Sequence, residues 1–300
     1  MGSSLGNWGP RLAFAGYLLA SVSPTALLAD SGQSAAQPWL LPAAMPALQL
    51  ADASDGEAGE AASPTSASPT GAGEGGEGEA GGSGRFAGAE PEELLLGQLL
   101  MTRGHLSIGY SLASQGMMDA AKPHLHHPIE ENYPLIEDAI EDRKLEPFEH
   151  ELEELSEAGG AELSDITPDY ESAMQKIDAD AKSVLEADAD RTHLVLDTAL
   201  RVLKQAADEY RESIEDGAIA EAVEYQDAMA FVAEARRLIE GEADALIARD
   251  GNKYAALLQE FDALQKAWPS AVPPASPVMS TAAVFGGVSR IEIAMLPLKG

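Results

Sequence analysis

The chain has 300 residues, with 19 Lys and Arg against 50 Asp and Glu, which gives a formal net charge of −31 at pH 7. Such an acidic chain is a poor partner for nucleic acid, because binding a polyanion requires clustered cations that release counterions. The sequence contains no Cys. This excludes a disulfide framework, a zinc-thiolate or iron–sulfur site and a cysteine nucleophile.

Residues 1–29 are typical of a secretory signal peptide. One basic residue, Arg11, precedes an apolar stretch from Leu12 to Val22, and the segment ends in small residues at Ala29. The stretch is shorter than the about 20 apolar residues that a membrane span needs. We therefore expect an exported, periplasmic protein, with an uncleaved anchor or a buried N-terminal helix as the alternative.

Residues 30–89 consist mainly of Ala, Gly, Ser, Pro and Glu. A segment with so few large apolar side chains cannot offset the entropy lost on ordering its backbone. We predict a disordered linker here. The glycines between 71 and 84 follow no predicted strand, so they do not indicate a nucleotide-binding loop.

The helical pattern begins at Pro91, where proline suits the first helical position and the neighbouring acids suit the positive end of the helix dipole. The first helix is expected to end at Gly116. A short element and a His-rich turn over residues 123–128 follow. A second long helix then runs to Glu157, with a kink at Pro134.

A third helix is predicted to open with Thr167 as its cap and Pro168 in its first turn. Its later half has an apolar stripe from Leu196 to Ile214 at steps of three and four residues. The pair Asp216-Gly217 predicts a tight turn. A returning helix is expected to end at Asp250-Gly251-Asn252, and a shorter helix follows, up to Trp268.

Long helices joined by short glycine-containing turns favour antiparallel neighbours. The predicted fold class is therefore all-α: an antiparallel helix bundle over residues 90–268, after the signal peptide and the linker. Four prolines between 269 and 277 predict that residues 269–300 form an extended Pro-rich tail.

A first candidate metal site lies where four of the six histidines gather, between residues 105 and 127. His127 precedes Glu130 and Glu131 by three and four positions, and His105 on the preceding helix can reach the same place. Histidine nitrogens and carboxylate oxygens together suit iron, zinc or copper. In the alternative, His127 caps a helix, and His124 and His126 are ordinary exposed loop side chains.

A second candidate set flanks the predicted turn at 216–217. If the helices around this turn pack antiparallel, Glu209 faces Glu224, Tyr225 and Asp227, and these oxygen atoms suit Fe³⁺ or a divalent cation. The alternative is that these acids line a solvated face, as most acids do in so acidic a chain.

The same residues carry a family resemblance. The segment 207–232 resembles the extracytoplasmic helical domain of bacterial oxidase-dependent iron permeases. The tetrapeptide His127-Pro-Ile-Glu130 is similar to the His-x-x-Glu element of imelysin-like periplasmic iron-associated proteins, although Leu125 replaces the glycine of the full pattern. The resemblance implies a soluble exported relative that binds or hands over iron, or another metal, near a membrane transporter.

We thus predict an exported metal-binding accessory protein in iron or copper handling or uptake. Its ion would be iron, with copper or zinc as alternatives, and its partner a membrane metal transporter or another periplasmic protein. We expect no enzymatic activity, no nucleic-acid partner and no small-molecule substrate.

The rival hypothesis is a helical protein-interaction module on a flexible tether, without metal, in which Gly104 and Gly109 only serve packing. The rival gains if His105 and His127 point to different sides of the bundle.

Overall fold

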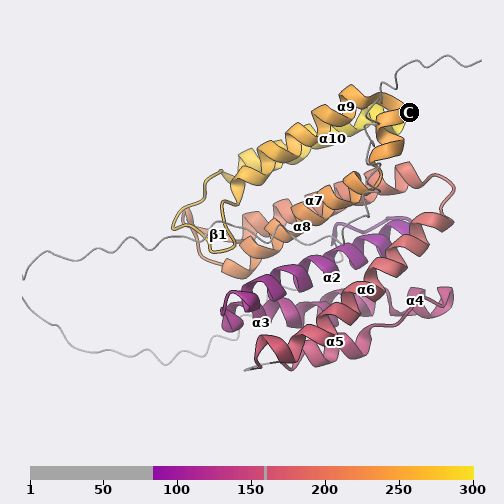
Figure 1. Ribbon diagram of the computed structural model, residues 1–300. Helices are drawn as coiled ribbons and strands as arrows, with labels where there is room; N and C mark the ends of the chain where they lie inside the picture. The colour runs from indigo at the N-terminus through magenta and orange to yellow at the C-terminus, as the bar shows by residue number, and fades with distance from the viewer. Residues whose placement is uncertain (1–83, 159–160) are drawn as a thin grey trace, which may run out of the picture. The chain divides into compact units, whose positions relative to one another are not determined.

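The computed structural model describes residues 84–158 and 161–300, and the chain there is almost entirely helical (Figure 1). The all-α prediction is confirmed. The predicted signal peptide 1–29 and most of the predicted linker 30–89 lie outside the described residues.

The first half of the described chain contains five α-helices and two short turns of other helix types. They are α2 (Pro91–Ser114), α3 (Met118–His127), a π-helical turn (Pro128–Asn132), a 3₁₀ turn (Tyr133–Leu135), α4 (Glu137–Arg143), α5 (Glu149–Ser156) and α6 (Leu163–Ala187).

The second half contains four α-helices, one small hairpin and a 3₁₀ turn. They are α7 (Arg191–Glu212), β1 (Ile214–Glu215), β2 (Ala218–Ile219), α8 (Ala222–Gly241), α9 (Ala243–Leu264), a 3₁₀ turn (Gln265–Ala267) and α10 (Thr281–Lys299).

Helix α2 lies at the centre of the helical unit. It packs against α3 and α6 on one side and against α7 and α8 on another, and every residue from Leu95 to Gly109 is buried (Figure 1). A helix can be buried all round only when apolar and small side chains surround it. As predicted, α2 begins at Pro91 and the chain leaves it at Gly116, whose φ of 77° suits glycine.

The hairpin of α7 and α8 was also predicted correctly. Asp216 and Gly217 have φ angles of 50° and 81°, the left-handed pair that a two-residue hairpin turn requires, and β1 pairs antiparallel with β2. Helix α7 also packs against α10, and α10 packs against α9. In Figure 1 the α7–α8 pair therefore separates α9 and α10 from the layer of α2, α3, α5 and α6.

A turn was predicted for the His-rich segment, but this segment forms the second half of α3. The predicted second long helix is also wrong, because the chain breaks into a π turn, a 3₁₀ turn, α4 and α5. Pro128 and Pro134 each lack an N–H group, so the regular hydrogen-bond ladder cannot continue through them. The predicted interruption at Pro134 is confirmed, since it lies in the 3₁₀ turn.

Helix α6 starts four residues before the predicted cap at Thr167. Glu162 and Asp165 form a reciprocal capping box, and the Thr167 hydroxyl donates to the carbonyl of Leu163 inside the helix, at 2.7 Å. Pro168 is tolerated because it is still close to the helix start. The predicted third helix is two helices, since Asp188–Asp190 separate α6 from α7.

The returning helix ends earlier than predicted, at Gly241, and α9 begins at Ala243. The expected break near Asp250 is a kink inside α9, where Asp250 has φ −161° and its carboxylate accepts from the N–H groups of Asn252 and Lys253.

The prediction of an extended tail over residues 269–300 is wrong for the second part of this segment, which forms α10. Ser280 caps this helix by accepting from the N–H of Ala283, at 3.2 Å, beyond the last proline of the connector. Among the described residues, α10 is the only helix whose length and apolar composition would suit a membrane span. One third of that span is buried against the rest of the protein.

The predicted linker boundary at residue 89 is too late. Phe86 is buried, and a Cβ atom on Gly97 would lie 2.1 Å from its ring, so α2 needs a glycine at this contact. The backbone carbonyl of Arg85 accepts from Arg201 on α7. The last residues before α2 are therefore packed on the helical unit.

Candidate metal centre

Two glycines of α2 allow three helices to meet closely around His105. A Cβ atom on Gly104 would lie 3.0 Å from the Phe231 ring on α8, and one on Gly109 would lie 3.2 Å from the Cβ of His124 on α3. The packing role that the rival hypothesis gave to these glycines is real. Their effect is to bring α3 and α8 to either side of His105.

One carboxylate, that of Asp227 on α8, lies among three imidazole rings. Its Oδ1 atom is 2.8 Å from Nδ1 of His105 and 2.8 Å from Nδ1 of His124. Its Oδ2 atom is 3.7 Å from Nδ1 of His127. His105, His124 and Asp227 are buried, whereas 23% of the His127 side chain is exposed. His127 is therefore the most exposed of these four residues.

The imidazoles hold Asp227 as a carboxylate. Burial alone would raise its pKa, but the charges and hydrogen bonds of His105 and His124 outweigh burial and hold the pKa well below the usual range. Burial lowers the pKa of His124 and His127, and the attraction of Asp227 reverses that effect, so both pKa values are raised. The two carboxylate oxygens of the buried Asp227 thus carry a negative charge at the centre of the cluster.

Three of these residues are placed so that one ion could bind them together. His105, His127 and Asp227 each offer a ligand atom, and the three atoms lie within 4.8 Å of one another. Two imidazoles and one carboxylate form the donor set that commonly binds Fe²⁺ in non-haem sites and that also suits Zn²⁺. His105 and His127 therefore point to the same place, with ring centroids 5.3 Å apart.

The second predicted set adjoins this cluster instead of forming a separate site. Burial raises the pKa of Glu209 on α7 and of Glu224 on α8, and a hydrogen bond between the two carboxyl groups keeps a proton on Glu209. Asp227 is close enough to add to both shifts, and the charges of Glu131 and His127 act on Glu224. The amide of Gln205 donates to Glu209. Glu209 and Glu224 thus adjoin the cluster of His105, His127 and Asp227, and the exposed Glu131 acts on it through its charge.

Two predicted ligands lie elsewhere. Glu130 is exposed and pairs with the half-buried His126, at 3.2 Å. The π turn that begins at Pro128 changes the helical spacing, so Glu130 does not follow His127 into the cluster. Tyr225 is buried on the opposite side of α8, where its hydroxyl donates to the carbonyl of Ser270, at 3.2 Å.

One histidine of the cluster was not among the predicted ligands. His124 was an exposed loop side chain in the alternative to the metal site, yet it is fully buried, and its Nε2 atom is 2.8 Å from Oε1 of Gln226. The available signal was the spacing of three between His124 and His127, which places both rings on one face of a helix. The prolines on both sides of this segment hid the helix.

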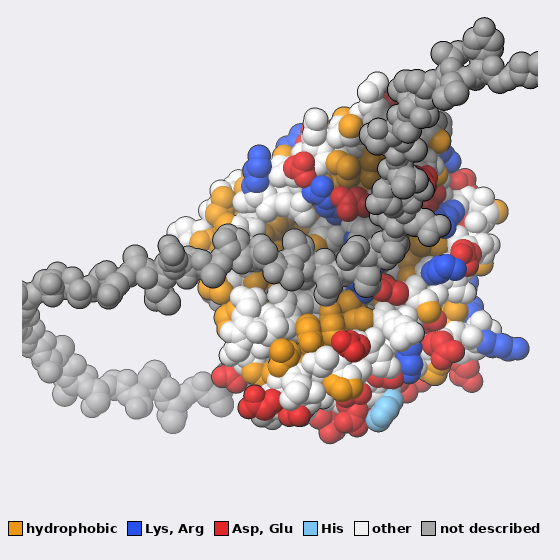
Figure 2. Space-filling view, viewed as in Figure 1, with side chains coloured by type: hydrophobic (Ala, Val, Ile, Leu, Met, Phe, Trp, Pro, Cys, Tyr) orange, Lys and Arg blue, Asp and Glu red, His pale blue; other side chains and the backbone are white. Residues whose placement is uncertain are grey.

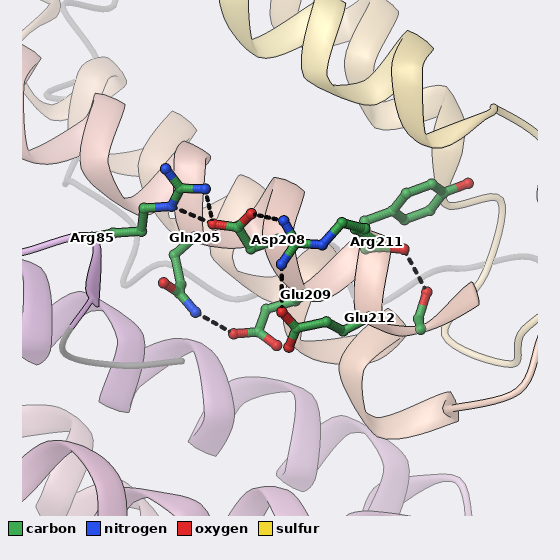
Figure 3. Close-up of polar contacts among 8 residues, drawn as sticks. Arg85, Gln205, Asp208, Glu209, Arg211 and Glu212 are labelled. Atoms are coloured by element: carbon green, nitrogen blue, oxygen red, sulfur yellow. Dashed lines mark hydrogen bonds and ion pairs between the residues drawn. The ribbon is translucent and has the colours of Figure 1, made fainter. Parts of the chain in front are cut away.

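A surface network borders the cluster on α7 (Figure 3). Asp208 pairs with Arg85, which precedes α2, and with Arg211, which also pairs with Glu212. Figure 3 shows Glu209 directed away from these arginines, toward Gln205. Arg211 and Glu212 are exposed and pair with each other, outside the candidate metal centre.

The comparison with known families finds a similarity for the second half of the helical unit. Residues 185–296 match the sequence model of the iron permease-associated 4-helix bundle domain. The matched segment comprises α7, α8, α9 and most of α10, and it includes the whole segment 207–232 on which the sequence resemblance rested. No curated protein and no solved structure matches the chain. Of the three residues that one ion could bind together, Asp227 lies inside the matched segment, whereas His105 and His127 come from the helices before it.

Proposed function

We propose that this protein is an exported accessory protein that binds iron and passes it to a membrane metal transporter. The observation that carries the proposal is the meeting of His105, His127 and Asp227, from three different helices, with ligand atoms within 4.8 Å. The match of residues 185–296 to an iron permease-associated bundle supports iron as the cargo. The proposed role is binding and transfer, without catalysis.

The carboxylates next to the triad favour iron over copper. Glu131 and Glu224 are close enough to His127 to act on its charge, and Glu209 hydrogen-bonds to Glu224. Carboxylate oxygens are hard ligands, and together with imidazole they suit Fe²⁺ or Fe³⁺. Zn²⁺ remains the alternative ion for the same donors. The partly exposed His127 would give the ion a route in and out.

The proposal also includes export of the protein and binding to a partner protein. The apolar segment 12–22 supports export, and an acidic surface would suit a carrier that collects cations. Figure 2 shows Asp and Glu side chains gathered along one edge of the helical unit, and exposed acids are frequent on α4 and α5. The partner would be a membrane metal transporter or another periplasmic protein.

The proposal is tested by metal titration. Fe²⁺ under anaerobic conditions and Zn²⁺ in air are titrated calorimetrically into the full chain and into a His105→Ala/His127→Ala double variant. We expect one ion per chain for the wild type and at least about a 100-fold weaker affinity for the double variant, since it lacks two of three ligands. His126→Ala is the matched control, because His126 lies on the same helix as His127 but pairs with the exposed Glu130, outside the cluster. Equal binding by the wild type and the double variant would rule out this site.

The interaction module without metal has no specific support in the described residues. Its own criterion was that His105 and His127 point to different sides, and their rings instead lie 5.3 Å apart.

A further inference from the structure

A chain of hydrogen bonds reaches the metal centre from the connector between α9 and α10. The amide nitrogen of Gln226 donates to the carbonyl of Ala271, at 2.9 Å, so its Oε1 atom faces the other way. That oxygen is 2.8 Å from Nε2 of His124. On the opposite edge of the same ring, Nδ1 of His124 is 2.8 Å from Oδ1 of Asp227.

The direction of each hydrogen bond in this chain is fixed by chemistry. A backbone carbonyl can only accept, which sets the orientation of the Gln226 amide. The Gln226 oxygen and the Asp227 carboxylate can also only accept, and each ring nitrogen of His124 lies 2.8 Å from one of them. His124 is fully buried, and Gln226 is buried beside it. Both ring nitrogens of His124 thus already face a polar partner, and neither faces an open position for an ion.

We propose that His124 is a positioning residue that holds Asp227 for the ion and does not itself bind the ion. This inference rests on the proposed function. Metal sites commonly contain such partners, which orient the ligands from outside. Here the ring fixes Oδ1 of Asp227, so that Oδ2 faces the ring of His127, at 3.7 Å.

The two histidines that share Oδ1 of Asp227 thus have different roles. Nδ1 of His105 is also 2.8 Å from this oxygen, but among the described residues the other ring nitrogen, Nε2, has no hydrogen-bond partner. An arriving ion can take a position at His105 without breaking a second contact. At His124 it would have to displace the Asp227 carboxylate from one edge of the ring or leave the buried Gln226 oxygen without its partner on the other. The ion is therefore expected at His105, His127 and Asp227.

The test compares two substitutions at one position in the full chain, with Co²⁺ as the probe ion. His124→Asn keeps an amide nitrogen near the place of Nδ1 and removes the ring. We expect its Co²⁺ affinity to stay within about 3-fold of the wild type. His124→Ala removes the donor, and we expect an affinity loss of about 10- to 100-fold, the usual range for a residue that orients a ligand. Far-ultraviolet circular dichroism establishes that both variants fold.

The absorption spectrum of bound Co²⁺ separates a positioning residue from a ligand. His124→Asn should leave the band positions unchanged, because the ligand set is the same, whereas His127→Asn should shift them. If His124→Asn shifts the bands and weakens binding as much as His124→Ala, then His124 is a ligand and the inference is wrong. It is also wrong if both His124 variants bind Co²⁺ as the wild type does. A wild type that binds no metal ion instead overturns the proposed function itself.

Discussion

Asp227 is the residue on which the candidate metal centre depends, because a single buried carboxylate contacts three imidazole rings. Removing one partner of a buried ion pair is costly, since the remaining charge has no water to solvate it. The stability of the folded protein therefore depends on the charge of Asp227, and it does not depend on the charge of Glu130, which is exposed.

We predict that Asp227→Asn lowers the free energy of unfolding by about 2 to 4 kcal/mol in the absence of metal. The amide keeps the size of the side chain but loses the charge that offsets His105 and His124. The same variant should bind Fe²⁺ or Zn²⁺ at least about 100-fold more weakly. Urea denaturation and calorimetric titration measure the two effects. Glu130→Gln is the control and should change neither, and an Asp227→Asn protein as stable as the wild type would contradict the charge argument.

Asp180 on α6 gives a pH-dependent prediction outside the metal centre. Burial raises its pKa to about 6, and its Oδ1 atom accepts only the N–H of Glu146, at 3.1 Å. Because the pKa in the folded state lies above the unfolded value, the folded protein binds more protons between about pH 4 and 6. The contribution of Asp180 is thus favourable at low pH and is lost as the pH rises through 6.

We predict that Asp180→Asn stabilises the protein by about 1 to 2 kcal/mol at pH 7.5, because the amide is never ionised. The gain should shrink toward zero at pH 4.5, where Asp180 is protonated. Urea denaturation at both pH values measures it, with Glu171→Gln on the exposed face of α6 as the control. A gain of the same size at both pH values would show that ionisation is not the cause.

At the scale of elements, the metal centre depends on how closely α3 approaches α2. The contact at Gly109 is already tight, since a Cβ atom there would lie 3.0 Å from a methyl group of Leu125 and 3.2 Å from the Cβ of His124. Helix α3 cannot move away from Gly109 without also moving His124 and His127, because α3 carries both side chains. Packing at a glycine and geometry at the ligands are therefore coupled.

We predict that Gly109→Ala costs about 1 to 3 kcal/mol of stability through overpacking and also weakens metal binding. Gly241→Ala is the matched control at the end of α8, where a Cβ atom meets no other atom within 4 Å. It should leave both properties unchanged or raise stability slightly. Thermal denaturation and metal titration of the two variants measure the difference. Unchanged metal binding in a destabilised Gly109→Ala protein would show that packing and ligand geometry are independent.

Local sequence signals predicted single elements better than contacts between them. The start of α2 and the turn at Asp216-Gly217 follow from the backbone preferences of proline, aspartate and glycine, which act within a few residues. Helix α10 was missed because prolines up to residue 277 suggested an extended tail, although Ser280 is a good cap. Tyr225 was assigned to the site with Asp227, but two residues along a helix point nearly opposite ways.

At the scale of the whole molecule, the sequence pointed to all three residues of the triad but placed them in two separate sites. His105 and His127 belonged to one predicted set and Asp227 to the other, and the two sets join only because α2 packs against both α3 and α8. The contact between α2 and α8 is made by tertiary packing of residues more than 100 positions apart, such as His105 and Asp227, and no local sequence pattern predicts it. A bound ion would tie the segment 185–296, through Asp227, to the helices that precede it.

Metal binding should therefore stabilise the helical unit as a whole. An ion that binds only the folded state adds about 2.7 kcal/mol at a free concentration 100 times its Kd. For a unit of this size we predict a rise in Tm of about 5 to 10 °C, since 1 kcal/mol corresponds to about 2 to 4 °C. Differential scanning calorimetry of the full chain with and without Zn²⁺ measures it.

The net charge of −31 makes a control for unspecific cation binding necessary. Exposed acids attract any divalent cation, but at about 0.15 M salt their field is screened beyond about 8 Å. Mg²⁺, which prefers oxygen ligands and binds imidazole poorly, should at this salt concentration produce a much smaller shift than Zn²⁺. The His105→Ala/His127→Ala variant should show the small shift with both ions. Equal shifts in the wild type and this variant would mean that the acidic surface, and not the metal centre, binds the cation.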